Sequence, residues 1–288
     1  MAALADFVEL ARPRHWVKGV FILMPVPFSI AAGAQLRLTP LVLGLIGFSL
    51  VTSAVYVFND LLDARLDRHH PDKKDRPLAA GRIGRGLAAL FSGVLLATGL
   101  GLLALTGIAA AAWIAGVYVG LNLFYSVRGK RIPLVDVFLL ASGFVLRVLL
   151  GCALVAVQAS NWLLLCSSTL ALFLALGKRR ADLVAGLDDQ HRPSHAGYNR
   201  ACVEQAIGIT AGVALVSYAL YCIEAEVLVP GREFASLPFV AFGILEYVRL
   251  VHTREAGGSP VDLALSSPSM LIVGVGWLVA VLWSTGFL

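Results

Sequence analysis

The chain has 288 residues, of which 58% are hydrophobic and 14% charged, and its mean hydropathy is +0.82. No ordinary soluble domain has this composition, so residues 1–288 are expected to form a single domain embedded in a lipid bilayer. The net charge is +5, but the basic residues are spread over the segments between apolar runs. We therefore expect no nucleic-acid partner.

Nine apolar segments approach the length that a helix needs to cross a membrane. They cover residues 16–34, 40–58, 87–106, 109–126, 134–157, 161–176, 205–222, 236–252 and 269–287. The pattern predicts an all-α polytopic protein with nine transmembrane helices. With nine spans, 20 of the 23 Lys and Arg residues lie on the same side of the membrane as the N-terminus. Only Arg37 and Arg232 lie on the opposite side, and Arg147 lies within a span. Because cytoplasmic loops are rich in Lys and Arg, the N-terminus and any active site are predicted to face the cytoplasm from the plasma (inner) membrane.

Acidic residues follow the second predicted span. At about 100° per residue, one helix face carries Asn59, Asp60, Asp63 and Asp67. Pro71 should end this helix, and the loop beyond it carries Lys73, Lys74 and Arg76. Adjacent carboxylates repel one another unless a positive group lies among them, and a hard divalent cation that holds a phosphorylated substrate meets this need. The alternative is a solvated loop of mixed charge between two membrane helices.

A second polar region lies at the start of the fifth predicted span. Pro133 suits the first turn of a helix, and Asp136 follows at its N-terminal end. Arg147 lies eleven residues further on, about 20° away on the same face and roughly 16 Å deeper in the membrane. An arginine at this depth normally faces a cavity filled by water or ligand. The alternative is an ion pair with a carboxylate on a neighbouring span that serves folding alone.

A third polar region ends the sixth predicted span. It carries Lys178, Arg179, Arg180 and Asp182. The basic residues could hold an anionic substrate, or they could be the ordinary positive flank of a membrane helix. These residues alone favour neither interpretation.

The three regions together resemble a known family. The pattern N-D-x-x-D-x-x-x-D at residues 59–67 resembles the UbiA superfamily of intramembrane prenyltransferases. More narrowly, the runs NDLLDARLDRHHPDKKDRPLAAG, YSVRGKRIPLVDVFLLASGFVLR and LGKRRADL resemble decaprenyl-phosphate phosphoribosyltransferases. The resemblance implies helices around a central cavity that opens to the cytoplasmic side. It also implies an Mg²⁺-dependent transfer of phosphoribose from 5-phosphoribosyl diphosphate to a polyprenyl (decaprenyl-type) phosphate. Diphosphate is released, and the product serves the synthesis of cell-wall arabinan and arabinogalactan.

The same resemblance assigns roles to individual residues. Mg²⁺ and the diphosphate would be held by Asn59, Asp60, Asp63 and Asp67, of which the three acids count as catalytic. Phosphate groups would be met by Lys73, Lys74 and Arg76, and the cavity would be lined by Tyr125, Lys130 and the catalytic candidates Asp136 and Arg147. Further substrate-binding candidates are Lys18, Arg68, Lys178, Arg179, Arg180 and Asp182. Ordinary prenyltransferases of the superfamily carry a second D-x-x-x-D after the sixth span, where this chain has mainly cations. Cations there suit a reaction that brings two anions together.

Two other functions remain open at this point. The first is an ordinary prenyltransferase that moves a polyprenyl chain from its diphosphate to an aromatic acceptor, which predicts the second acidic cluster that this chain lacks. The second is a lipid-phosphate or metal transporter, which predicts charges that are accessible from both sides of the membrane. The sequence leaves the oligomeric state open and allows a homo-oligomer.

Overall fold

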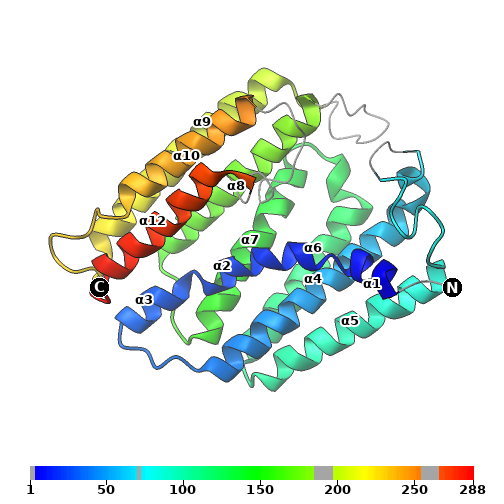
Figure 1. The fold of residues 1–288 in the computed structure, drawn as a ribbon, viewed down its shortest axis with the longest axis horizontal. Coiled ribbons are helices and arrows are strands. Elements are labelled where there is room, and N and C mark those ends of the chain that lie inside the picture. The colour runs from blue at the N-terminus through cyan, green and yellow to red at the C-terminus, as the bar shows by residue number, and fades with distance from the viewer. Residues whose placement is uncertain (1–3, 70–72, 185–196, 254–265) are drawn as a thin grey trace.

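The computed structural model describes residues 4–69, 73–184, 197–253 and 266–288. Within these ranges all regular structure is helical (Figure 1). The N-terminal elements are α1 (Leu4–Ala11), the 3₁₀ helix η1 (Pro13–Gly19), α2 (Val20–Leu23) and α3 (Pro25–Ala31). The long helices that follow are α4 (Leu38–Asp67), α5 (Arg85–Leu105), α6 (Ala109–Val127), α7 (Val135–Leu154), α8 (Asn161–Val184) and α9 (Arg200–Glu224). The short η2 (Gly129–Arg131) precedes α7, and α10 (Leu237–Thr253) and α12 (Pro268–Ser284) complete the described part.

Six of the described helices, α4 to α9, are long and apolar enough to cross a membrane. The predicted spans 236–252 and 269–287 coincide with α10 and α12, which have 17 residues each. The predicted span 16–34 is divided into η1, α2 and α3 instead of forming one helix. Pro25 and Pro27 explain the division, because proline lacks the N–H that a continuous helix needs. The count of nine membrane crossings therefore stays a prediction.

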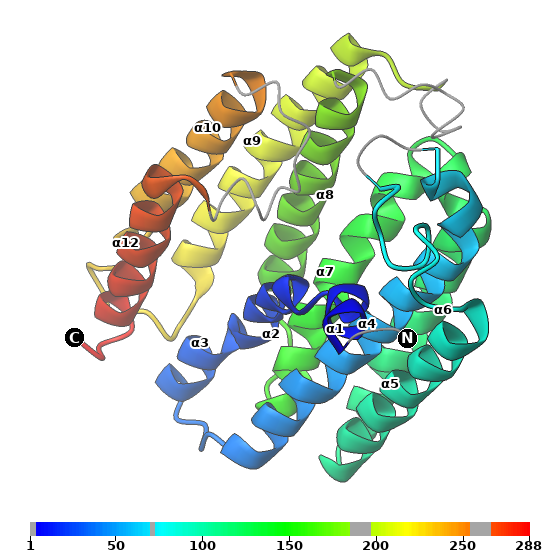
Figure 2. The same ribbon diagram turned by 45° about the vertical axis from the view of Figure 1, so that its right-hand side comes forward.

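Helices that follow one another in the chain pack side by side. Contacts join α4 to α5 and α6, α6 to α7, α7 to α8, α8 to α9, α9 to α10 and α10 to α12. The segment α2–α3 runs between the α4–α5 side and the α9–α10–α12 side of the molecule (Figures 1 and 2). Helices α7 and α8 also lie between these two sides, and α2 and α3 both pack on α7.

Two glycine contacts bring helix backbones unusually close. A Cβ atom on Gly47 would lie 2.8 Å from the carbonyl oxygen of Gly99, and a Cβ on Gly99 would lie 2.6 Å from that of Gly47. Helices α4 and α5 can approach this closely only because both positions lack a side chain. A Cβ on Gly151 of α7 would collide with the carbonyl oxygen of Ile22, so the absence of a side chain at Gly151 likewise lets α2 pack closely on α7.

The C-terminal third of α4 extends beyond the predicted span 40–58 and carries the acidic residues. The predicted helix over residues 59–67 is confirmed, since α4 is continuous to Asp67. Pro71 lies outside the described residues, and residues 73–83 form turns, as predicted. A small apolar cluster holds α1 and these turns against α4; its buried members are Leu10, Val57, Ala64, Leu78, Ile83 and Ala88. The local fold therefore places the N-terminal segment beside the acidic face.

Candidate active site

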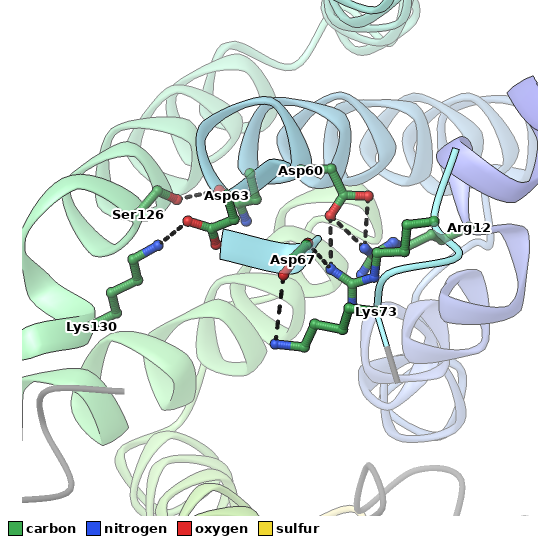
Figure 3. Close-up of polar contacts among 9 residues, drawn as sticks. Arg12, Asp60, Asp63, Asp67, Lys73, Ser126 and Lys130 are labelled. Atoms are coloured by element: carbon green, nitrogen blue, oxygen red, sulfur yellow. Dashed lines mark hydrogen bonds and ion pairs between the residues drawn. The ribbon is translucent and has the colours of Figure 1, made fainter. Parts of the chain in front are cut away.

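The acidic face of α4 is neutralised by basic side chains from three other segments (Figure 3). Asp60 accepts hydrogen bonds from Nη2 of Arg12 at 2.6 and 2.8 Å and from Nη1 of Arg76 at 3.1 Å. The same Nη1 atom lies 2.9 Å from Asp67, and Nζ of Lys73 lies 4.0 Å from Asp67. The side chains of Asp60 and Asp67 are each only 6% exposed. These two acids are therefore buried beneath the cations that pair with them.

The other two predicted ligands on this face turn toward the end of α6. Asp63 accepts a hydrogen bond from Nζ of Lys130 at 2.5 Å, and its side chain is 32% exposed. The amide oxygen of Asn59 accepts a hydrogen bond from the hydroxyl of Ser126. Tyr125, the neighbour of Ser126, is half-buried at the same end of α6. The sequence names Lys130 as a residue of the cavity wall, and the structure pairs it with Asp63; the sequence gives no sign of Ser126.

The arrangement fits a cation shared by Asp60 and Asp67. Their oxygens converge on one positively charged atom, Nη1 of Arg76, at 3.1 and 2.9 Å. A divalent ion at this point would draw both oxygens closer, because Mg²⁺ binds oxygen at about 2.0–2.1 Å. In the described part of the chain, no group of three or more acids, histidines or cysteines already converges as a metal site. The residues present therefore offer suitable oxygen donors, but the chain's own cation stands among them.

A group of cations surrounds His15 next to the acidic face. Burial, together with nearby positive charges, lowers the pKa of His15 from its usual 6.5 to about 4. These charges belong to Lys18, Arg12, Lys178 and Arg76, in order of decreasing effect. The imidazole is therefore neutral near pH 7, because burial and the four nearby basic side chains both disfavour its protonated form. Lys18 also approaches the hydroxyl of Tyr56 at 3.4 Å.

Two further basic candidates, Arg68 and Lys74, lie at the end of α4 and in the turns that follow it. Arg68 donates a hydrogen bond to the backbone oxygen of Ala79 at 3.2 Å, which ties the end of α4 to the loop. Lys74 is exposed. Among the residues that the structure describes, neither side chain forms a hydrogen bond or ion pair with the acids of α4.

Arg147 is buried without a carboxylate partner in the described ranges. Its Nη1 donates to the backbone oxygen of Gly143 at 2.6 Å, and its Nη2 donates to Thr52 at 3.3 Å and to Tyr118 at 3.4 Å. The guanidinium group also lies over the rings of Phe48, Tyr118 and Phe144. Among the described residues, Arg147 therefore does not form the ion pair with a carboxylate of a neighbouring span that was the alternative interpretation. Because Thr52 precedes Asp60 by eight residues, Arg147 lies about 12 Å along α4 from the acidic face.

Asp136 and Arg179 form an ion pair in the fully buried interior. Nη2 of Arg179 lies 2.8 Å from Asp136, both side chains are 0% exposed, and Nη1 of Arg179 reaches Asp182 at 3.1 Å. Tyr198 donates a hydrogen bond to Asp136 at 2.6 Å, and burial together with this bond raises the pKa of Tyr198. The predicted site residues Asp136, Arg179 and Asp182 are therefore partners of one another.

The third polar region is divided because α8 continues to Val184. Successive residues on a helix point about 100° apart. Lys178 consequently lies close enough to His15 for its charge to lower the pKa of the imidazole. Arg180 instead donates hydrogen bonds to Glu204 at 2.9 Å and to the backbone oxygen of Val251 at 2.6 Å. The structure brings Lys178 to the cations near the acidic face and directs Arg180 toward α9 and α10.

An apolar cavity of about 310 Å³ lies between α2–α3 and the helices α8, α9, α10 and α12. Its wall on the α2–α3 side is formed by Phe21, Met24 and Phe28, and opposite residues include Leu170, Tyr247 and Met270. Phe21 follows Lys18 by three residues, so one short segment borders both the cations and the apolar cavity. The site can accordingly accept a ligand with an anionic head and an apolar chain.

These features define an integral membrane protein with a charged site next to an apolar cavity. The sequence profile of the UbiA prenyltransferase family matches residues 20–261, and the chain belongs to this family. It is a transferase.

Two relatives of this chain carry the same name. The decaprenyl-phosphate phosphoribosyltransferase of Corynebacterium glutamicum is 32% identical over 287 residues, which cover 96% of this chain and 85% of the relative. The protein of that name from Mycobacterium tuberculosis is 30% identical over 294 residues, which cover 96% and 93%. The predicted resemblance to this group is confirmed.

Solved structures show the same fold. A UbiA homolog from Archaeoglobus fulgidus, bound to GPP and Mg²⁺, superimposes with a TM-score of 0.73 over 97% of this chain and 98% of that chain, at 20% identity. The same homolog bound to DMAPP and Mg²⁺ also gives a TM-score of 0.73. The predicted UbiA-type fold is confirmed by this likeness.

Proposed function

We propose that this protein transfers phosphoribose from 5-phosphoribosyl diphosphate to a polyprenyl phosphate of the decaprenyl type and releases diphosphate. The observation that carries the proposal is similarity over 96% of the chain to two proteins named decaprenyl-phosphate phosphoribosyltransferase. The site supports it, since acids that suit a metal lie beside four cations around His15. A substrate pair with two anionic groups needs both kinds of residue. The product would serve as a lipid-linked precursor of arabinan.

The proposed roles follow from position. Asp60 and Asp67 would hold Mg²⁺, which when bound neutralises the negative charge that develops on the departing diphosphate. Lys18 and Lys178 attract the phosphate groups to the region around His15. The bond from the anomeric carbon to diphosphate breaks, and an oxygen of the lipid phosphate forms the new bond to that carbon. No general base is required, because a phosphate monoester is already largely ionised near pH 7.

The apolar cavity takes the lipid in this proposal. The polyprenyl phosphate would place its head near Lys18 and its first isoprene units against Phe21, Met24 and Phe28. The rest of the chain would extend into the bilayer, because 310 Å³ is too small for a long polyprenyl group. Arg147 lies at a deeper level than the acids, so we propose no direct contact between it and the metal-bound diphosphate.

We further propose that the acidic face lies on the cytoplasmic side of the plasma (inner) membrane. The support is the bias of 20 Lys and Arg residues to 2 between the two sides of the predicted topology. In a background without native cysteines, Pro230→Cys should react with a membrane-impermeant maleimide in intact cells, and Arg131→Cys should react only after lysis. Labelling of Arg131→Cys in intact cells would overturn this orientation.

The activity is tested with purified protein in detergent, labelled 5-phosphoribosyl diphosphate, Mg²⁺ and a panel of polyprenyl phosphates. We expect label to enter the lipid fraction only when a polyprenyl phosphate and Mg²⁺ are both present. The control replaces these substrates with a polyprenyl diphosphate and an aromatic acid. Prenylation of the acid, with no use of phosphoribosyl diphosphate, would show that the protein is an ordinary prenyltransferase and reject the proposal.

A further inference from the structure

Two arginines meet at Asp60 from very different surroundings. Arg12 belongs to the junction of α1 and η1, where its backbone is left-handed with φ 54° and ψ 57°. A residue other than glycine rarely adopts this conformation, because it is sterically unfavourable, and such residues often occur at functional sites.

The backbone beside Arg12 is fixed by packing and hydrogen bonds. The carbonyl oxygen of Ala11 accepts a hydrogen bond from the hydroxyl of Ser53 at 2.7 Å, and that hydroxyl accepts one from the indole of Trp16 at 2.9 Å. Leu10 is fully buried. The guanidinium group of Arg12 also lies 5.4 Å from the ring centre of Tyr56. Arg12 therefore has little freedom to leave Asp60.

Arg76 is held in a less restrictive way. It lies among the turns of residues 73–83, its side chain is 29% exposed, and one nitrogen atom, Nη1, makes both of the ion pairs that it forms with described residues. Those pairs are with Asp60 and Asp67, the two acids that converge on a single point. This atom occupies the position where a shared metal ion would lie.

A count of acceptor positions indicates which arginine can remain when a metal binds. A carboxylate offers about four lone-pair positions. Arg12 takes one position on each oxygen of Asp60, and Arg76 takes a further one on Oδ1. A divalent ion can replace Arg76 without displacing Arg12. It cannot share the point between Asp60 and Asp67 with Arg76, because two positive charges at that distance repel each other strongly in a partly buried site.

We propose that Arg12 and Arg76 have opposite roles toward the metal. Arg12 is a positioning residue that keeps the carboxylate of Asp60 aimed at the metal position. Arg76 is a placeholder cation that occupies this position in the metal-free protein and leaves it when the divalent ion binds. The inference rests on the metal dependence in the proposed function, but it concerns binding of the ion alone and not the identity of the sugar donor or acceptor.

The test measures Mn²⁺ binding to purified protein in detergent, by the EPR signal of the free ion and without any substrate. Arg76→Ala should bind Mn²⁺ about tenfold more tightly than the wild type, because the competing cation is gone. Arg12→Ala should bind it about 10–100-fold more weakly, which is the usual effect of losing a residue that orients a metal ligand. Arg12→Lys should lie between Arg12→Ala and the wild type, because it keeps a positive partner for Asp60.

Arg200→Ala is the matched control, because Arg200 is an exposed arginine that pairs with Glu204 on α9. Its Mn²⁺ affinity should equal that of the wild type. Loss of positive charge alone predicts tighter binding for both Arg12→Ala and Arg76→Ala, and general damage to the fold predicts weaker binding for both. The proposal is therefore overturned if the two variants shift in the same direction, if neither shifts, or if the wild type binds no Mn²⁺. Opposite shifts in a protein that fails to use phosphoribosyl diphosphate would reject the proposed activity and leave this inference standing.

Discussion

Asp60→Asn should lower the rate of phosphoribosyl transfer at saturating Mg²⁺ by about three orders of magnitude. The carboxylate is one of the two that converge on a shared cation position, and loss of a charged metal ligand removes several kcal/mol of transition-state stabilisation. The protein should stay folded, because Arg12 and Arg76 remain 22% and 29% exposed, respectively, and Arg76 keeps its ion pair with Asp67. Initial rates across an Mg²⁺ titration, together with thermal melting in detergent, measure the two effects separately.

Asp75→Asn is the matched control for this prediction. Asp75 is an exposed acid next to Arg76 in the turns that follow α4, and its backbone oxygen, which the substitution leaves intact, accepts a hydrogen bond from Arg82. This variant should retain the wild-type rate. If Asp60→Asn keeps a near wild-type rate at low Mg²⁺, Asp60 is not a metal ligand and the assignment of the acidic face fails.

Arg179→Ala should destabilise the folded protein by about 3–5 kcal/mol, because it leaves a buried carboxylate without its ion-pair partner. Asp136 is 0% exposed and would retain hydrogen bonds from Tyr198 and from the backbone of Val137. Chemical unfolding in detergent measures the loss. The double variant Arg179→Ala/Asp136→Asn should recover part of it, since the second change removes the uncompensated charge.

Lys178→Ala, at the position before Arg179, is expected to affect activity and not stability. We expect its stability to stay close to that of the wild type, and its transfer efficiency to fall roughly ten- to a hundredfold through loss of a charge-assisted contact to phosphate. Equal melting of Arg179→Ala and the wild type would contradict the structural role of Arg179. A fully stable but inactive Arg179→Ala would instead favour the substrate-binding role that the sequence predicts.

The sequence predicts local features of this protein well. The helical continuation over residues 59–67 follows from short-range spacing, and the structure confirms it. The division of the first span is visible in Pro25 and Pro27, but hydrophobicity alone conceals it. The sequence groups residues 178–182 as one basic region, but α8 runs through them and turns Lys178, Arg179 and Arg180 toward different neighbours.

Long-range pairing is the part that the sequence could not supply. Arg12 and Asp60 are 48 positions apart, and nothing in either local pattern connects them. The acidic face predicts a metal because its charges have no partner in the local sequence, yet Arg12, Arg76 and Lys130 balance them in the folded chain. Whether a charge cluster is compensated depends on which loops the fold brings to it, and that follows from tertiary packing.

The contact between Gly47 and Gly99 has a mechanical consequence for the site. A Cβ atom at either glycine would lie within 2.8 Å of the other's carbonyl oxygen, and the hydroxyl of Ser92 on α5 also donates to the backbone oxygen of Ala54 on α4 at 2.9 Å. These contacts oppose sliding of α4 against α5, so the helix that carries the acids is held in place by its neighbour. The cations that pair with the acids come from other segments, and we expect these cations, not the acids, to adjust when a metal ion binds.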